Sequence, residues 1–323
     1  MTIFLTCLAC RRIYAAKPIV RLKPTMFRGL TERRPWCATN GFTPTRTVPF
    51  PTLKLIWFWK RTPGSAGDPL SPMKNKAIQK QFDARSAIFS KSASWVTNRG
   101  LLAAHRRAIK GLLPEKGRML EACCGTGEIT GALKRRGLET HGLDISTGML
   151  SKAARHIRRL RRGDAHSLPY PDGFFDAVVM RQAMQFLTPR LFLKEAARVL
   201  KPGGTLLLSH HVPQNRAERV RLLRIYRLIQ PSGIFKDPSK LYLACDLRAH
   251  ILCSGLRLKR ELPHFSTESI TALLKCYPNL SKERKSRIFK AYLGAGPACG
   301  IATKKGELLA RWKWVIFAAQ KPA

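Results

Sequence analysis

A run of small residues lies between an apolar segment and a helical pattern, and it reads Leu120-Glu121-Ala122-Cys123-Cys124-Gly125-Thr126-Gly127-Glu128. Small side chains at a strand-to-helix turn let a ligand approach the bare backbone, as in nucleotide-binding loops. Asp144 follows about 20 residues later, where a carboxylate at the end of the next strand reaches the ribose hydroxyls of a nucleoside. A tight structural turn would explain the loop alone, but the loop and the acid together predict a nucleoside site.

Alternating strands and helices must position this loop. Apolar strand candidates span Met119–Ala122, His141–Leu143, Phe175–Met180 and Thr205–Ser209. Helical spacing separates them at Ile129–Arg136, Met149–Arg162 and Leu191–Leu200. Upstream, the spacing of Phe82, Ile88 and Trp95, and then of Leu101 to Leu112, suits two amphipathic helices. The alternation predicts a parallel, doubly wound α/β sheet.

Further elements follow the loop and Asp144 in a fixed order. They are Gly142–Ser146, Gly163–Pro169, Phe174–Val178 and Arg198–Gly204. The series resembles the class I S-adenosylmethionine-dependent methyltransferases, in the type 11 group that includes the ubiquinone and menaquinone C-methyltransferases, over roughly residues 80–211. A dehydrogenase binding NAD would place an acid similarly, but the order G-x-G-x-x-G is absent. The resemblance implies S-adenosylmethionine as cofactor and a Rossmann-like, mostly parallel seven-stranded sheet.

The resemblance also implies roles for individual residues. Glu121 and the backbone of Cys124 to Gly127 would hold the methionine end, Asp144 both ribose hydroxyls, and Asp164 the adenine amino group. Ile145 would pack on the adenine, and the Ala165 N–H would reach a ring nitrogen. The full set of implied cofactor contacts is Glu121, Ala122, Cys123, Cys124, Gly125, Thr126, Gly127, Asp144, Ile145, Met149, Asp164, Ala165, Arg181 and Gln182.

Position 123 departs from the family, which usually has Gly or another small residue there. Its Cys would crowd the cofactor, yet Cys is small enough that we expect binding to survive. Cys123 and Cys124 are interpreted as packing residues rather than catalytic thiols.

The catalytic demands on such a protein are modest. The sulfonium of the cofactor activates its own methyl group, so the protein must align a nucleophilic atom and exclude water. His210 and His211 at the end of the fifth strand are candidate bases for a phenol or an acidic carbon, or else a partly exposed strand end. Arg181 is a candidate partner for an anionic or carbonyl group, or else a structural surface residue. Gln185 falls where many relatives carry His.

The C-terminal third is expected to complete the sheet and cap the site. Arg216–Ile229 is predicted to be an amphipathic lid helix, Leu241–Cys253 another helix, and Trp312–Ala319 an antiparallel closing strand. Ser266–Ala295 is expected to be a helical insertion that shapes the acceptor pocket with the N-terminal helices. The cap segments therefore lie near 214–230 and 266–295. The aromatic residues of the insertion, Tyr277, Phe289 and Tyr292, are interpreted as core.

Charge and cysteine content limit the partners. A net charge of +40 allows weak contact with nucleic acid or an anionic membrane surface, although basic residues lie in every segment. Six of them crowd the expected helix at 149–162, either as a solvated face or as phosphate contacts: Lys152, Arg155, Arg158, Arg159, Arg161 and Arg162. Nine scattered cysteines indicate neither a zinc site nor a disulfide framework, so no metal is expected.

Residues 1–72 differ from the methyltransferase domain expected at 73–323. They hold twelve Lys or Arg against two acids and show no sustained periodicity, which predicts a disordered leader. It is an upstream extension of the reading frame, an organellar transit peptide or a basic tail. Its apolar stretches are far shorter than the roughly 20 residues that span a membrane. We expect a cytoplasmic protein, or a mitochondrial one if the leader is a transit peptide; the oligomeric state is left open.

Two classes of acceptor fit this chain. The first is a small aromatic or polyketide-like molecule, with a quinone precursor among the candidates, methylated at carbon or oxygen. The second is tRNA or rRNA. The segment after the fourth strand lacks the Asn/Asp-Pro-Pro-Tyr/Phe element used for amide or exocyclic nitrogen, and no RNA-binding module is evident. The small molecule is therefore the leading hypothesis.

Overall fold

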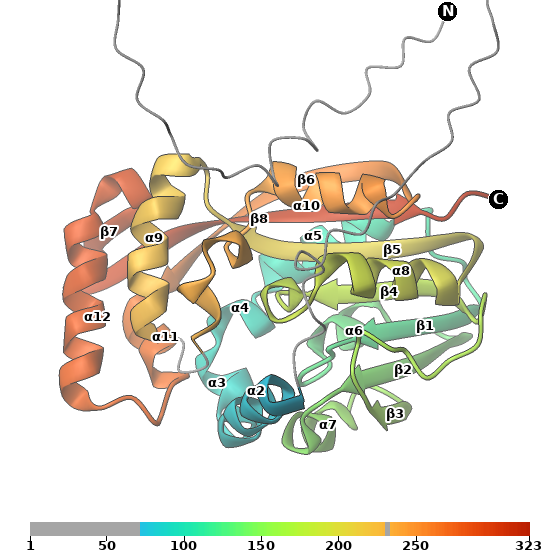
Figure 1. Ribbon diagram of the computed structural model, residues 1–323, viewed down its shortest axis with the longest axis horizontal. Coiled ribbons are helices and arrows are strands. Elements are labelled where there is room, and N and C mark those ends of the chain that lie inside the picture. The colour runs from blue at the N-terminus through green and yellow to red at the C-terminus, as the bar shows by residue number, and fades with distance from the viewer. Residues whose placement is uncertain (1–71, 230–232) are drawn as a thin grey trace, which may run out of the picture. The chain divides into compact units, whose positions relative to one another are not determined.

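Parallel strands form the centre of a mixed α/β unit in the computed structural model, which describes residues 72–229 and 233–323 (Figure 1). The parallel strands are β1 (Gly117–Ala122), β2 (Leu138–Asp144), β3 (Arg159–Arg162), β4 (Phe175–Arg181) and β5 (Leu200–Val212). Two long strands extend the sheet beyond β5: β8 (Glu307–Gln320) pairs antiparallel with β5, and β6 (Arg257–Ser269) pairs antiparallel with β8. The order β3-β2-β1-β4-β5-β8-β6 confirms the predicted Rossmann-like sheet.

Helices follow the strands as the alternation predicts. They are α6 (Glu128–Leu133) after β1, α7 (Thr147–Ala153) after β2 and α8 (Pro189–Val199) after β4. From residue 72 onward, four helices precede the sheet: α2 (Pro72–Arg85), α3 (Phe89–Ser92), α4 (Ser94–Thr97) and α5 (Arg99–Ile109). The C-terminal helices are α9 (Arg216–Ile229), α10 (Ala244–Cys253), α11 (Ile270–Lys275) and α12 (Lys282–Ala295). Figure 1 shows α9, α11 and α12 grouped beside β7, away from β1 to β3.

Side-chain alternation along the strands separates the two larger clusters of the core. In β4, Ala177 and Val179 pack into one cluster, whereas Val178 and Met180 pack into the other. Both sides of the strand are buried because successive side chains of a strand point to opposite faces. This two-sided burial explains the continuous apolar run that identified the strand in the sequence.

The expected helix at 149–162 was wrong in its second half. Helix α7 ends at Ala153, and Arg159–Arg162 form β3, the edge strand of the sheet beside β2. Three of its four side chains are exposed, so β3 lacks the apolar pattern that marks a buried strand. The six basic residues therefore do not share a helix face.

Two further boundaries differ from the sequence prediction. The insertion expected as helical from Ser266 begins as strand, because β6 continues to Ser269 through its pairing with β8. The chain then returns through a short strand, β7 (Ile301–Lys304), which pairs with the first residues of β8. Over the part of the chain that the structure describes, the sheet has eight strands rather than the expected seven. A four-residue strand in a polar segment carries too little pattern to be recognised.

Candidate functional site

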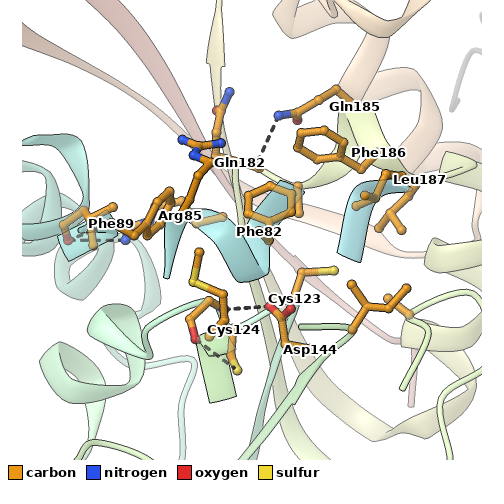
Figure 2. Close-up of a pocket in the computed structure, with 18 of the residues that line it drawn as sticks. Phe82, Arg85, Phe89, Cys123, Cys124, Asp144, Gln182, Gln185, Phe186 and Leu187 are labelled. Carbon is orange, nitrogen blue, oxygen red and sulfur yellow. Dashed lines mark hydrogen bonds between the residues drawn. The ribbon is translucent and has the colours of Figure 1, made fainter. Parts of the chain in front are cut away.

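A cavity lies at the carboxyl ends of β1, β2 and β4 (Figure 2). All the residues expected to contact a cofactor line it except Ala122 and Gly127. Ala122 points into the core, and Gly127 is the N-cap of α6. The two acids, Asp144 and Asp164, come from the ends of neighbouring strands, as expected of a crevice outside the carboxyl edge of a parallel sheet.

The loop between β1 and α6 is held in an unusual backbone conformation. Cys123, Gly125 and Gly127 have φ values of 54°, 51° and 76°. The Cys124 N–H donates to the Leu143 carbonyl (3.0 Å), which joins the loop to β2. A Cβ atom at Gly125 would meet only Phe89, at 3.9 Å, so the backbone there faces open space. The loop thus offers bare backbone to a ligand.

The backbone at Cys123 is strained, because a positive φ is unfavourable for residues with a Cβ atom. We expect Cys123→Val to lower the free energy of unfolding by about 1–3 kcal/mol, since a β-branched residue tolerates this region poorly. Cys123→Gly should not destabilise the protein, because Gly adopts a positive φ freely. Urea denaturation measures both effects. Cys276→Val is the matched control, since Cys276 is buried at a φ of −66°; equal losses at both positions would contradict the strain.

Asp144 is a buried carboxylate fixed by the backbone around it. Its Oδ2 accepts from the Gly125 N–H (2.8 Å) and its Oδ1 from the Ser146 N–H (2.9 Å). Burial raises the pKa of Asp144, while the backbone hydrogen bonds oppose the rise. The carboxylate lines the cavity at only 8% exposure, and each oxygen can accept a further hydrogen bond.

Asp164 has a different environment at the end of β3. It accepts from Asn75 Nδ2 (2.9 Å) on α2 and from the backbone N–H of His166 (2.9 Å). Partial burial raises its pKa, but the hydrogen bonds from His166 and Asn75 outweigh burial and leave the pKa below its ordinary value. The sequence did not indicate the contact with Asn75, because it joins residues 89 positions apart.

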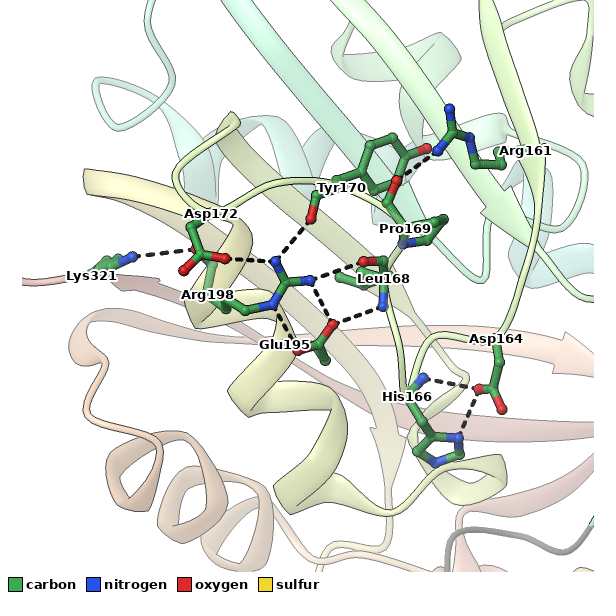
Figure 3. A network of polar contacts seen from close by, with 10 residues as sticks. All are labelled: Arg161, Asp164, His166, Leu168, Pro169, Tyr170, Asp172, Glu195, Arg198 and Lys321. Atoms are coloured by element: carbon green, nitrogen blue, oxygen red, sulfur yellow. Dashed lines mark hydrogen bonds and ion pairs between the residues drawn. The ribbon is translucent and has the colours of Figure 1, made fainter.

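His166 orients Asp164 through a fixed tautomer (Figure 3). The Thr188 N–H donates to its Nε2 (2.8 Å), so the ring proton sits on Nδ1 and is donated to Asp164 Oδ1 (2.7 Å). The segment that follows is tied down by Arg198 of α8, which donates to the Leu168 and Tyr170 carbonyls and pairs with Glu195 and Asp172. Arg198, the first residue of the Arg198–Gly204 element, therefore supports the loop that carries Asp164.

Glu121 is buried behind the loop. Its Oε2 accepts from the backbone N–H (2.9 Å) and the hydroxyl (2.5 Å) of Thr130, in the first turn of α6. Burial raises the pKa of Glu121 to about 7, against the lowering effects of Thr130 and of the nearby Arg181. One carboxylate oxygen is thus committed to the helix N-terminus.

Arg181 lies at the end of β4 and lines the cavity, which contradicts its interpretation as a surface residue. Its Nη1 and Nη2 both donate to the Val96 carbonyl (3.3 Å each). Burial lowers the pKa of Arg181 to about 10, with Glu121 opposing the shift. Gln182, the next residue, has a φ of 52° and accepts from the His211 backbone N–H through Oε1 (2.6 Å).

The two histidines of β5 differ in position. His211 lines the cavity, and its Nδ1 lies 3.2 Å from the Tyr226 hydroxyl. His210 does not line it; its ring contacts Gln185 Oε1 (2.8 Å) and the His211 carbonyl (2.7 Å). Both are at most 4% exposed, so the interpretation as a partly exposed strand end was wrong. Burial lowers the pKa of His210 to about 4 and that of His211 to about 3.

These buried imidazoles predict a loss of stability in acid. Burial also lowers the pKa of His105 to about 3. The His105 ring forms hydrogen bonds with the Leu101 carbonyl and the Ser209 hydroxyl. The unfolded chain binds protons near pH 6.5 and the folded one does not, so the free energy of unfolding should fall as the pH drops from 6.5 toward 4.5. Glu121, with its raised pKa, gives the opposite slope between 4.5 and about 7, but three imidazoles outweigh one carboxyl.

Urea denaturation at pH 7, 6 and 5 measures this slope. The variant His105→Gln should show a smaller loss, because its amide keeps hydrogen-bonding groups near Leu101 and Ser209 but does not titrate. A free energy of unfolding that stays level or rises toward pH 5 would contradict the prediction.

An aromatic wall continues the cavity beyond Arg181 and Gln182. Its members come from α2, α3, α9, β8, the α11–α12 segment and the short helical turns after β4 and after α9, and they include Phe82, Phe89, Phe186, Tyr226, Phe235, Tyr277, Trp312 and Trp314. The cap segments thus line the cavity with the N-terminal helices. Tyr277 is a lining residue rather than core alone, whereas Phe289 and Tyr292 pack in the core. In α2, Ile78, Phe82 and Arg85 line it at spacings typical of one helix face.

The remaining predictions concern metal ions, membrane-spanning helices and the leader. In residues 72–229 and 233–323, no group of three or more His, Cys, Asp or Glu could hold a metal ion. No helix among these residues is long and apolar enough to cross a membrane. The leader, residues 1–72, lies outside the described residues except for Pro72.

Known proteins resemble this chain in sequence and in fold. The family model of the methyltransferase domain matches residues 120–208. Demethylmenaquinone methyltransferase of Geobacillus stearothermophilus is 30% identical over 174 residues, 49% of this chain and 73% of that protein. The enzyme of the same name from Bacillus licheniformis is 36% identical over 132 residues, 37% of this chain and 56% of that protein. The chain spans about half the length of several curated relatives that it matches.

A solved structure shows the same fold. The YcgJ protein of Bacillus subtilis superposes with a TM-score of 0.58 at 20% identity, over 68% of this chain and 99% of that one. At this level of identity the likeness concerns the fold alone.

Proposed function

The chain belongs to the class I S-adenosylmethionine-dependent methyltransferases, and we propose that it transfers the methyl group to a carbon or oxygen of a small, largely apolar molecule such as an aromatic metabolite or a quinone precursor. One observation carries this proposal. A single cavity joins the polar strand ends that hold Asp144 and Asp164 to the aromatic wall around His211 and Tyr226. A nucleoside and an apolar acceptor can therefore meet within it.

The residues at the strand ends fit the cofactor. Asp144 presents a fixed carboxylate with acceptor capacity left for two ribose hydroxyls, and Asp164 presents another where the adenine amino group would lie. The open backbone at Gly125 gives the methionine end a close approach. S-adenosylmethionine would supply a methyl group already activated by its sulfonium.

The chain's own residues then position and shield the acceptor. The aromatic side chains exclude water and hold a planar or apolar molecule against the cofactor end of the cavity. Burial lowers the pKa of His211 to about 3, so its imidazole is neutral at pH 7 but a weak base. It would serve as a hydrogen-bond acceptor for a phenol or an acidic carbon and take the proton only as the methyl group is transferred. His210 does not line the cavity and is therefore given no contact with the acceptor.

Two measurements test the proposal. Isothermal titration of the chain from Met73 onward should show binding of S-adenosylmethionine and S-adenosylhomocysteine, and no binding of NAD. A radiolabelled methyl-transfer screen of cell extract, fractionated into lipids, small polar metabolites, RNA and protein, should label a small-molecule or lipid fraction. Absence of binding to both nucleosides would overturn the family role, whereas label in protein alone would overturn the acceptor class.

Methylation of RNA is the second candidate. A separate hollow near the starts of β1 and β2 is lined by Arg118, Arg158, Arg159 and Arg161, which would suit phosphates. It lies at the opposite strand ends from the cavity, and Glu139 already pairs with Arg118 and Arg159. Label in the RNA fraction, with RNA affinity that falls steeply as salt rises, would place this candidate first.

A further inference from the structure

Arg85 places a guanidinium inside the aromatic part of the cavity. It projects from α2 and lines the cavity at 5% exposure (Figure 2). Its Cζ lies 4.4 Å from the ring centroid of Tyr277, 5.1 Å from that of Phe89 and 5.4 Å from that of Phe82. Three aromatic faces thus surround one positive charge, an arrangement that stabilises a cation and holds its plane in place.

The hydrogen bonding of this guanidinium is incomplete. Its Nε donates to the Cys276 carbonyl at 3.0 Å. Among the described residues, neither terminal nitrogen of Arg85 has a hydrogen-bond acceptor, and no carboxylate lies within 4.0 Å. Other arginines of the chain are paired: Arg198 binds Glu195 and Asp172, and Arg248 binds Glu261. A buried arginine is rarely left without an anionic partner, because desolvating its charge is costly.

We propose that Arg85 binds a carboxylate inside the cavity, and that this carboxylate belongs to the methyl acceptor. The two terminal nitrogens present parallel N–H donors, the geometry that matches a carboxylate with two hydrogen bonds. Tyr277 provides the ring nearest to Arg85, and the Cys276 carbonyl accepts the hydrogen bond from its Nε. Both residues directly follow α11, in the α11–α12 segment that forms part of the aromatic wall. The acceptor is therefore an apolar or aromatic acid. This inference rests on the proposed function, since it concerns the same cavity.

The amino-acid end of S-adenosylmethionine could supply the same chemistry, because the Phe89 ring that contacts Arg85 lies 3.9 Å from the place where a Cβ atom on Gly125 would be. Binding measurements separate the two sources. S-adenosylhomocysteine carries the amino-acid carboxylate, and 5′-methylthioadenosine lacks it. For the acceptor, benzoate and its neutral match benzamide serve as probes, titrated in the presence of S-adenosylhomocysteine and detected by ligand-observed NMR.

Two substitutions separate the charge of Arg85 from its paired N–H donors. Arg85→Met retains apolar contact with the three rings and removes the charge, and Arg85→Lys retains the charge without the paired donors. Lys80→Met is the matched control, because Lys80 is exposed on the same helix. Its binding should equal that of the wild type for every probe.

We expect Arg85→Met to weaken benzoate binding by at least about tenfold, with benzamide and both nucleosides unchanged. Arg85→Lys should recover part of the loss. A tenfold loss for S-adenosylhomocysteine but not for 5′-methylthioadenosine would keep the carboxylate site and reassign it to the cofactor. If Arg85→Met bound benzoate and S-adenosylhomocysteine as tightly as the wild type does, the inference would be overturned. Failure of the wild type to bind S-adenosylhomocysteine would instead count against the proposed function.

Discussion

Replacing Asp144 with Asn is expected to weaken the binding of S-adenosylmethionine by about 100-fold to 10,000-fold, the loss of two hydrogen bonds to a charged acceptor at roughly 1.5–3 kcal/mol each. An amide has one acceptor oxygen, whereas Asp144 uses both of its oxygens to accept from Gly125 and Ser146. The amide N–H₂ of Asn would face one of these backbone donors. The substitution therefore damages the loop as well as the ribose contact, and isothermal titration reports the sum.

A stability measurement separates the two effects of this substitution. Urea denaturation of Asp144→Asn without ligand gives the cost to the loop, and the remaining loss of affinity belongs to the ligand contact. Glu115→Gln is the control, because Glu115 is an exposed carboxylate that lies outside the cavity lining. An affinity of Asp144→Asn within a few-fold of the wild type would remove Asp144 from the cofactor site.

For His211→Gln we expect turnover to fall by about 100-fold while the affinity for S-adenosylmethionine is unchanged, provided that the acceptor must lose a proton. Gln retains the length and the hydrogen bonding near Tyr226 but cannot accept a proton at neutral pH. The pKa of His211 lies near 3, so wild-type turnover should show no loss near pH 6.5 from this residue. A methyl-transfer assay with the acceptor found by the screen measures both quantities.

His210→Gln provides the comparison for this prediction. His210 is as deeply buried as His211 and adjacent to it, but it does not line the cavity. A general effect of removing a buried imidazole from β5 would lower turnover in both variants. Only a larger loss at His211 supports a role in proton transfer, and full turnover in His211→Gln would exclude that role.

The sequence by itself determined the centre of this protein. The small-residue loop, the acid after the second strand and the apolar runs of β1, β2, β4 and β5 are local patterns, and each reflects a constraint within a few residues. Buried strands are apolar because both of their faces are covered, and the loop is small because a ligand must reach its backbone. These features placed Asp144 at the carboxyl edge of the sheet, whereas Asp164 was implied only by the family resemblance of the Gly163–Pro169 element.

The tertiary structure alone decided which remote segments complete the cavity. Arg85 meets the Cys276 carbonyl across 191 positions, and Asn75 meets Asp164 across 89. Strand β3 was hidden for a related reason, since an edge strand with one neighbour and exposed arginines needs no apolar pattern. Spacing in a sequence records only which side chains share a face of one element. Contacts between elements depend on how those faces pack, and packing is what brings Arg85 among three aromatic rings in the cavity.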